Sequence, residues 1–165
     1  MFKESIDTIL KQNKKKRLKE LSRNLDNIVF LDFDGVINLD LDNYSGPFTN
    51  KNLINNLNKL CLEYNLKIVV ISSWRKYSDY REILYKSGLD NKIEILGSTD
   101  NMETEREKEV IKYIKEYPYI NKFIILDDKP FGILKKYQVQ TDIDKGFDNN
   151  KYREAINLLK EDKYD

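Results

Sequence analysis

The stretch that decides the fold is residues 28–36, which read IVFLDFDGV. Four apolar residues rich in β-formers indicate a buried strand, and two acids, Asp32 and Asp34, follow where this strand should end. A buried carboxylate without a partner destabilises a protein by several kcal/mol or becomes protonated. A divalent cation is the usual way to stabilise such acids, so the stretch predicts a metal site at which chemistry takes place.

Composition indicates an ordinary globular domain. The chain has 165 residues, of which 40% are hydrophobic and 35% charged, and its net charge is +1. These values predict one soluble domain over residues 1–165, with no overall field that would attract nucleic acid. The sequence suggests neither a membrane span nor a signal peptide. We therefore expect a cytoplasmic protein that is a monomer or a weak homodimer.

The missing residue types exclude several classes of enzyme. The chain has no histidine, so it cannot use a Ser-His-Asp or Cys-His arrangement. Its single cysteine, Cys61, excludes a disulfide framework and a Cys-rich zinc site, and its apolar helical context predicts a core residue. A cysteine phosphatase would need arginine six positions on, where Lys67 stands. Catalysis is expected from carboxylates, hydroxyls, lysine or arginine.

Strands and helices alternate along the chain. Apolar runs predict strands at residues 28–33, 67–72, 93–96, 122–126 and 138–141. Periodicity predicts helices at residues 2–25 and 77–86. Capping residues predict the start of three more helices. The first runs from a cap at 49 or 50 to about 64, the second from a cap at Thr104 to before Pro118, and the third from a cap at 148 or 150 onward. This alternation indicates a three-layer, Rossmann-like α/β fold with a parallel sheet of about five strands and helices on both faces.

Polar residues follow three of the predicted strands. In parallel sheets the strands present their carboxyl ends at one edge, where ligands bind. We therefore expect one crevice to collect the pairs at these three strand ends, which are Asp32 and Asp34, Ser72 and Ser73, and Asp127 and Asp128. Each pair taken alone could instead be a turn or a helix cap.

These motifs, in this order, resemble those of the haloacid dehalogenase (HAD) superfamily. The resemblance rests on DFDGV at 32–36, a serine after an apolar strand, a basic residue opening a later helix, and ILDD at 125–128, and it covers about residues 28–160. The strings ISSWR at 71–75 and REKEV at 106–110 resemble a narrower branch, the HAD domain of Swiss army knife RNA-repair proteins. The branch implies a HAD-like fold, here without a cap domain, because residues 35–49 and 74–103 are too few to form one.

The resemblance implies a role for each acid. Asp32 would attack a phosphoryl group and form an aspartyl-phosphate, and Asp34 would protonate the leaving oxygen and then activate water. Mg²⁺ would be held by Asp32, the main-chain carbonyl of Asp34, and one or both of Asp127 and Asp128. Carboxylate oxygens are the ligands that this cation prefers.

The same resemblance implies the phosphate contacts. Ser72, with Ser73 beside it, would bind the phosphoryl oxygens, while Arg75 is either a further phosphate contact or a surface ion pair. A cation from the helix after Thr104 would offset the charge of the transition state. The branch pattern aligns Arg106 there, so we favour Arg106 and leave Lys108 open. Only one of the two should reach the site, since positions two apart on a helix face different ways.

An open crevice would admit a bulky phosphorylated substrate. We expect a Mg²⁺-dependent phosphatase that acts on RNA or DNA ends or on nucleotides. The N-terminal helix, within residues 1–26, is expected to pack on or flank the core, and its basic run Lys11–Lys19 is either a guide for a phosphate backbone or a solvated face. Tyr44 and Phe48 could stack on a base or pack under a loop, and Trp74 is expected to pack.

Two alternatives stay open. One is a capless phosphoprotein phosphatase, although members of that class tend to have threonine where Gly35 stands. The other is a non-catalytic HAD-like module that binds phosphate or nucleic acid. A response-regulator receiver does not fit, because the late strand here carries a second acid pair and no lysine ends a fifth strand. A toprim domain does not fit either, because it places a glutamate first and a DxD pair later, the reverse of this chain.

Overall fold

A computed structural model of the chain describes residues 5–18, 24–39, 49–76, 79–102 and 104–161. Its centre is a parallel sheet of five strands in the order β3-β2-β1-β4-β5. The strands are β1 Asp26–Leu31, β2 Leu66–Val70, β3 Ile95–Ser98, β4 Ile120–Asp127 and β5 Gln138–Gln140. The helices are α1 Ile6–Arg17, α2 Lys51–Tyr64, α3 Tyr80–Lys86, α4 Arg106–Glu116 and α5 Asn149–Lys160, with short 3-10 turns η2 at Ser73–Lys76 and η3 at Lys135–Tyr137.

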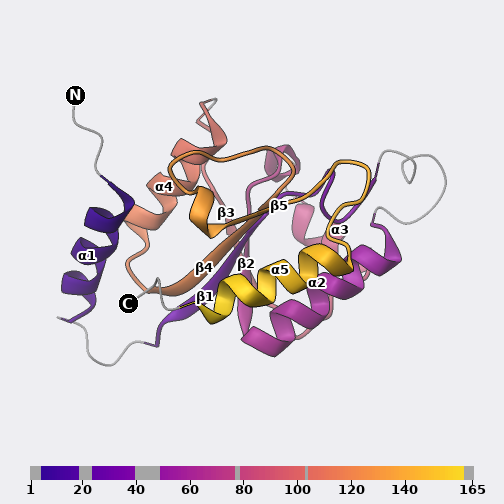
Figure 1. The fold of residues 1–165 in the computed structure, drawn as a ribbon, viewed down its shortest axis with the longest axis horizontal. Helices are drawn as coiled ribbons and strands as arrows, with labels where there is room; N and C mark the ends of the chain where they lie inside the picture. The colour runs from indigo at the N-terminus through magenta and orange to yellow at the C-terminus, as the bar shows by residue number, and fades with distance from the viewer. Residues whose placement is uncertain (1–4, 19–23, 40–48, 77–78, 103, 162–165) are drawn as a thin grey trace.

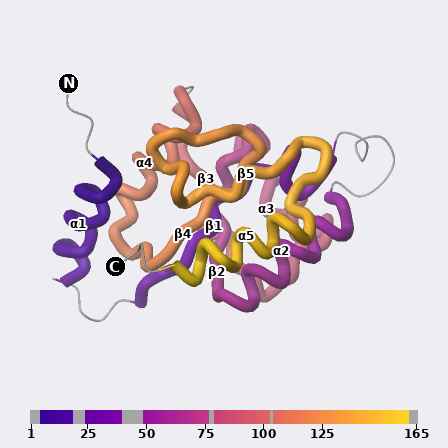
Figure 2. The backbone as a smooth tube through the Cα atoms, in the orientation of Figure 1, coloured from indigo at the N-terminus to yellow at the C-terminus, as the bar shows by residue number. Residues whose placement is uncertain are grey.

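Helices cover both faces of the sheet, which confirms the predicted three-layer fold. Alternate residues of β1 enter different cores: Val29 packs with α2, α3 and α5, whereas Phe30 packs with α1 and α4. Figure 1 shows α2 and α5 side by side on one face, and Figure 2 shows α1 beside α4 at the other flank. No cap domain is present among the described residues, and no helix there is long and apolar enough to cross a membrane.

Most predicted boundaries agree with the structure to within a few residues. Asn50 caps α2 through its side chain, and Asp148 caps α5. The predicted cap at Thr104 is wrong, because α4 begins after Glu105 and has no side-chain cap. The N-terminal helix is also shorter than predicted: it ends at Arg17, and part of the predicted range, together with Tyr44 and Phe48, lies outside the described residues.

Helix α1 is anchored to the amino edge of the sheet. Asn13 Nδ2 donates to the carbonyl of Ile114 at 2.8 Å. The Arg17 guanidinium donates to the carbonyls of Pro118 and Ile120, where β4 begins, at 3.0 and 3.1 Å. The basic end of α1 therefore lies at the edge opposite to the strand ends that carry the acids. The position of this basic end does not support the predicted contact with nucleic acid, which stays a prediction.

Candidate active site

The site begins where β1 leaves the sheet. The Asp32 backbone N–H donates to the carbonyl of Leu126 at 3.0 Å, so the acid is held at the last rung between β1 and β4. The chain then turns back, with Val36 N–H donating to the carbonyl of Phe33 at 3.1 Å. Because Asp32 directly follows the central strand β1, its side chain is only 6% exposed.

Three carboxylates meet at this point, and we call Asp32, Asp127 and Asp128 the acid trio. One oxygen from each lies within 4.8 Å of the others, and Asp127 is completely buried. Gly35 makes the approach of Asp128 possible: it has φ +79°, and a Cβ built there would lie 3.0 Å from Asp128 Cγ. Hard oxygen donors in such a cluster fit a divalent cation such as Mg²⁺ or Ca²⁺.

The carboxylates of the acid trio repel one another when no metal ion is bound. Burial, followed by the negative charge of Asp127, raises the pKa of Asp32 to about 8, although Arg106 opposes this shift. The pKa of Asp128 is also raised, chiefly by burial. A bound cation would favour the ionised form of both acids, so the trio is better suited to holding a metal than to standing alone.

Arg106, rather than Lys108, reaches the acids. Arg106 is the first residue of α4, and its Nη1 lies 3.2 Å from Asp32 Oδ2 and 2.8 Å from Asp127 Oδ2. Lys108 is exposed two positions further on. This position agrees with the preference for Arg106, and the catalytic role of this residue stays a prediction.

Two side chains hold the carboxylate of Asp34, which is exposed. Asn38 Nδ2 donates to Asp34 Oδ1 at 3.0 Å, and the Trp74 indole N–H donates to Asp34 Oδ2 at 3.3 Å. Sequence reasoning did not find either contact. Trp74 packs against the core as expected, but its bond to Asp34 joins residues 40 positions apart, which no local pattern reveals.

The segment after β2 is held to α4 by a buried ion pair. Arg75 donates to Glu109 Oε1 at 2.7 Å, and the two side chains are 7% and 2% exposed. Arg75 also donates to the carbonyls of Ile71 and Ser72 at 2.7 and 2.9 Å. This side chain is therefore a link between β2 and α4, and its contact with phosphate stays a prediction.

The two serines differ in their surroundings. Ser72 is completely buried, and its Oγ accepts a hydrogen bond from the Trp74 backbone N–H at 3.2 Å. The Ser72 hydroxyl still has its own proton to donate. Ser73 is exposed at the start of η2. Both lie at the carboxyl edge of the sheet, as predicted, and their binding of phosphate stays a prediction.

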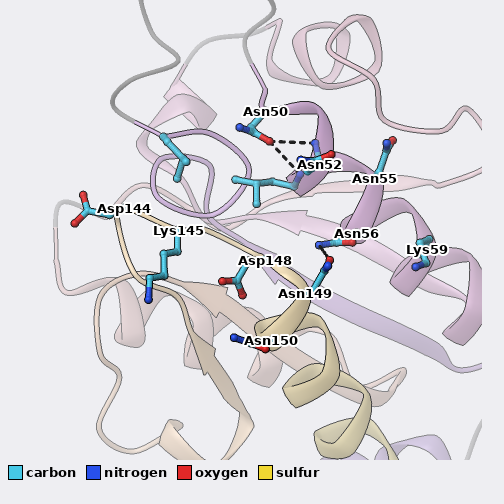
Figure 3. A pocket seen from close by; sticks show the side chains of 12 residues that line it. Asn50, Asn52, Asn55, Asn56, Lys59, Asp144, Lys145, Asp148, Asn149 and Asn150 are labelled. Atoms are coloured by element: carbon cyan, nitrogen blue, oxygen red, sulfur yellow. Dashed lines mark hydrogen bonds between the residues drawn. The ribbon is translucent and has the colours of Figure 1, made fainter.

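A cavity rich in asparagine flanks the site on the side of α2 and α5. It has a volume of about 750 Å³ and is lined by six asparagines, with Asp144 and Asp148 balancing Lys59 and Lys145 (Figure 3). Asn56 bridges the two helices by donating to Asn149 Oδ1 at 3.1 Å. None of the acid trio lines this cavity, and its charges cancel. Sequence reasoning did not predict it.

The family model for the HAD domain in Swiss Army Knife RNA repair proteins matches residues 28–152. The chain belongs to this family. The match spans the acid trio, Arg106 and the ion pair between Arg75 and Glu109. No curated protein and no solved structure gives a significant match. Membership supports a HAD-type phosphohydrolase in general terms. The acid trio, in which Asp32 and Asp127 are buried, is consistent with the metal dependence typical of such domains.

Proposed function

We propose that this HAD domain is a Mg²⁺-dependent phosphohydrolase that removes phosphate from a nucleic-acid end or a nucleotide through an aspartyl-phosphate. The observation that carries the proposal is the convergence of the acid trio with Arg106, which lies 3.2 Å from the proposed nucleophile, Asp32. The description of the matched family, which names RNA repair proteins, supports a nucleic-acid substrate.

The proposed reaction has two steps. In the first, an Asp32 carboxylate oxygen forms a bond to phosphorus while the bond from phosphorus to the leaving oxygen breaks, and Asp34 gives that oxygen a proton. In the second, Asp34 takes a proton from water, whose oxygen attacks phosphorus and releases phosphate and free Asp32. The bonds from Asn38 and Trp74 keep Asp34 in one orientation for both transfers.

Charge is the main obstacle to this reaction. When bound, Mg²⁺ would offset the negative charges of the acid trio and of the substrate phosphate. Arg106 adds a fixed positive charge beside Asp32 and stabilises the charge that develops on the phosphoryl oxygens. Ser72 would donate its hydroxyl proton to one of those oxygens.

The test measures phosphate release with Mg²⁺ and with EDTA. The panel contains phosphate-ended oligonucleotides, mononucleotides and phosphopeptides. We expect Asp32→Asn to abolish release while far-UV circular dichroism stays native, and we expect Asp144→Asn, which changes an exposed acid at the same edge, to keep wild-type activity. Full activity of Asp32→Asn would refute the mechanism, and a preference for phosphopeptides would favour a phosphoprotein phosphatase.

A further inference from the structure

A second cavity lies beside the acid trio, on the opposite side of Arg106. It has a volume of about 270 Å³ and is bounded by η2, the segment before α4, the first turn of α4, and the residue that follows Asp128. Four cationic side chains line it, and among the residues that the structure describes Glu109 is the one acid that does so. The cations are Arg75, Lys76, Arg106 and Lys129. We call this the basic cavity.

Two of these cations are already neutralised within the protein. Arg75 pairs with Glu109, and Arg106 contacts Asp32 and Asp127, neither of which lines the cavity. Arg106 thus separates the acid trio from the basic cavity and touches both.

Lys76 and Lys129 leave the basic cavity with excess positive charge. Both are exposed, and neither forms an ion pair with another residue in the part of the chain that the structure describes. The Lys129 backbone N–H donates to Asp127 Oδ1 at 3.0 Å, which holds this lysine close to the acid trio. Lysine is a common phosphate ligand because its ammonium is a compact charge with three donors.

We propose that the basic cavity binds a second phosphate of the same substrate, next to the one that is removed. The proposal rests on the proposed function, because it assumes that the first phosphate lies at the acid trio. The substrate class is then a phosphomonoester with a neighbouring phosphate group. Two sources have this chemistry: a strand end, whose neighbour is a phosphodiester, and a nucleoside bisphosphate.

Comparison with the asparagine-rich cavity shows why we assign the second phosphate to the basic cavity. Among the described residues that line it, two acids balance two lysines, so these residues offer no net attraction to an anion (Figure 3). Of the two cavities, as the described residues line them, only the basic one combines excess positive charge with direct contact to a residue that touches Asp32. Lys145, which is exposed in the asparagine-rich cavity, is a matched control for Lys76 and Lys129.

Binding is measured on Asp32→Asn, which should not turn over the ligand. The only tryptophan of the chain, Trp74, donates to Asp34, so its fluorescence reports ligand at the site. One pair of ligands is adenosine 3′,5′-bisphosphate and adenosine 5′-monophosphate. The other is a dinucleotide with a terminal phosphate and the same molecule with an uncharged methylphosphonate linkage, which tests the phosphodiester source.

We expect the second phosphate to tighten binding by about tenfold in at least one pair, and the pair that responds identifies the source. Changing both Lys76→Gln and Lys129→Gln should bring the ratio of affinities toward one and lower the salt dependence of binding, whereas Lys145→Gln should leave the ratio unchanged. Each single lysine variant should lower the ratio of affinities partway toward one. The single variants therefore provide a second test if the double variant folds poorly.

Three results would overturn the inference. The two ligands of each pair could bind with equal affinity, or the ratio of affinities could be unchanged in the double lysine variant. The third is a fall of this ratio in Lys145→Gln as large as in the double lysine variant. The proposed function fails in a different way. If the wild-type protein releases no phosphate from any ester but the lysine-dependent ratio persists, the basic cavity is a phosphate site in a domain that lacks the proposed activity.

Discussion

Replacing Asp32 by asparagine should stabilise the metal-free protein, and increasingly so as the pH rises. Burial and the charge of Asp127 raise the pKa of Asp32 from its ordinary 3.8 to about 8. Between these values the folded state holds a proton that the unfolded chain has released. Stability therefore falls as pH rises through this window, by up to about 1.4 kcal/mol per pH unit, and asparagine removes this loss because it cannot ionise.

The magnitude at pH 7 follows from the same linkage. Keeping Asp32 protonated roughly three pH units above its ordinary pKa destabilises the fold by up to about 4 kcal/mol. Asparagine has nearly the same shape and can still accept from Arg106, although this bond is weaker than the present contact at 3.2 Å. The expected gain in stability is therefore somewhat below that limit.

Urea unfolding in EDTA at pH 5.5, 6.5 and 7.5, followed by Trp74 fluorescence, measures this difference. The gain of Asp32→Asn over wild type should grow with pH, and Asp144→Asn should follow the wild-type curve. Mg²⁺ at about one hundred times its dissociation constant should stabilise the wild type by about 2.7 kcal/mol, and Asp32→Asn much less.

Two outcomes would contradict this reasoning. Asp32→Asn could be less stable than wild type in EDTA at every pH, which would show that the buried carboxylate is stabilising without a metal. Alternatively, the two proteins could lose stability in parallel as the pH rises, which would show that Asp32 does not hold its proton in the folded state.

Three further predictions concern the neighbours of the acid trio. Arg106→Ala should lower kcat/KM for phosphate release by about one hundredfold, while Lys108→Ala changes it little. A larger loss in Lys108→Ala than in Arg106→Ala would mean that the wrong cation has been assigned. Arg75→Met should destabilise the fold in urea by about 3–5 kcal/mol, because it leaves Glu109 buried and unpaired. The double variant with Glu109→Leu should recover most of that loss, and failure to recover would show that Arg75 acts through other contacts. Gly35→Ala should destabilise the protein by about 1–3 kcal/mol, since φ is +79°. It should also weaken Mg²⁺ binding in calorimetry, because the new methyl would crowd the acid trio. Unchanged Mg²⁺ binding would show that the turn at Gly35 does not shape the metal site.

Sequence alone determined the fold class and the position of the acids. Buried parallel strands are continuous apolar runs, and a polar residue at the end of such a run marks the carboxyl edge of the sheet. This local pattern was enough to place Asp32 and Asp127 together, although they are far apart in the chain. The pattern of residues 28–36 and 122–128 therefore predicted correctly that these acids lie together, and their role in catalysis stays a prediction.

Only the tertiary structure decided which side chains surround that centre. The choice of Arg106 over Lys108 depends on how α4 is rotated against the sheet, and its periodicity does not specify this rotation. The bond from Trp74 to Asp34 joins residues 40 apart, and the pair of Arg75 with Glu109 joins residues 34 apart. Such contacts depend on how η2 packs against its neighbours, because packing sets the direction of each side chain and sequence spacing does not.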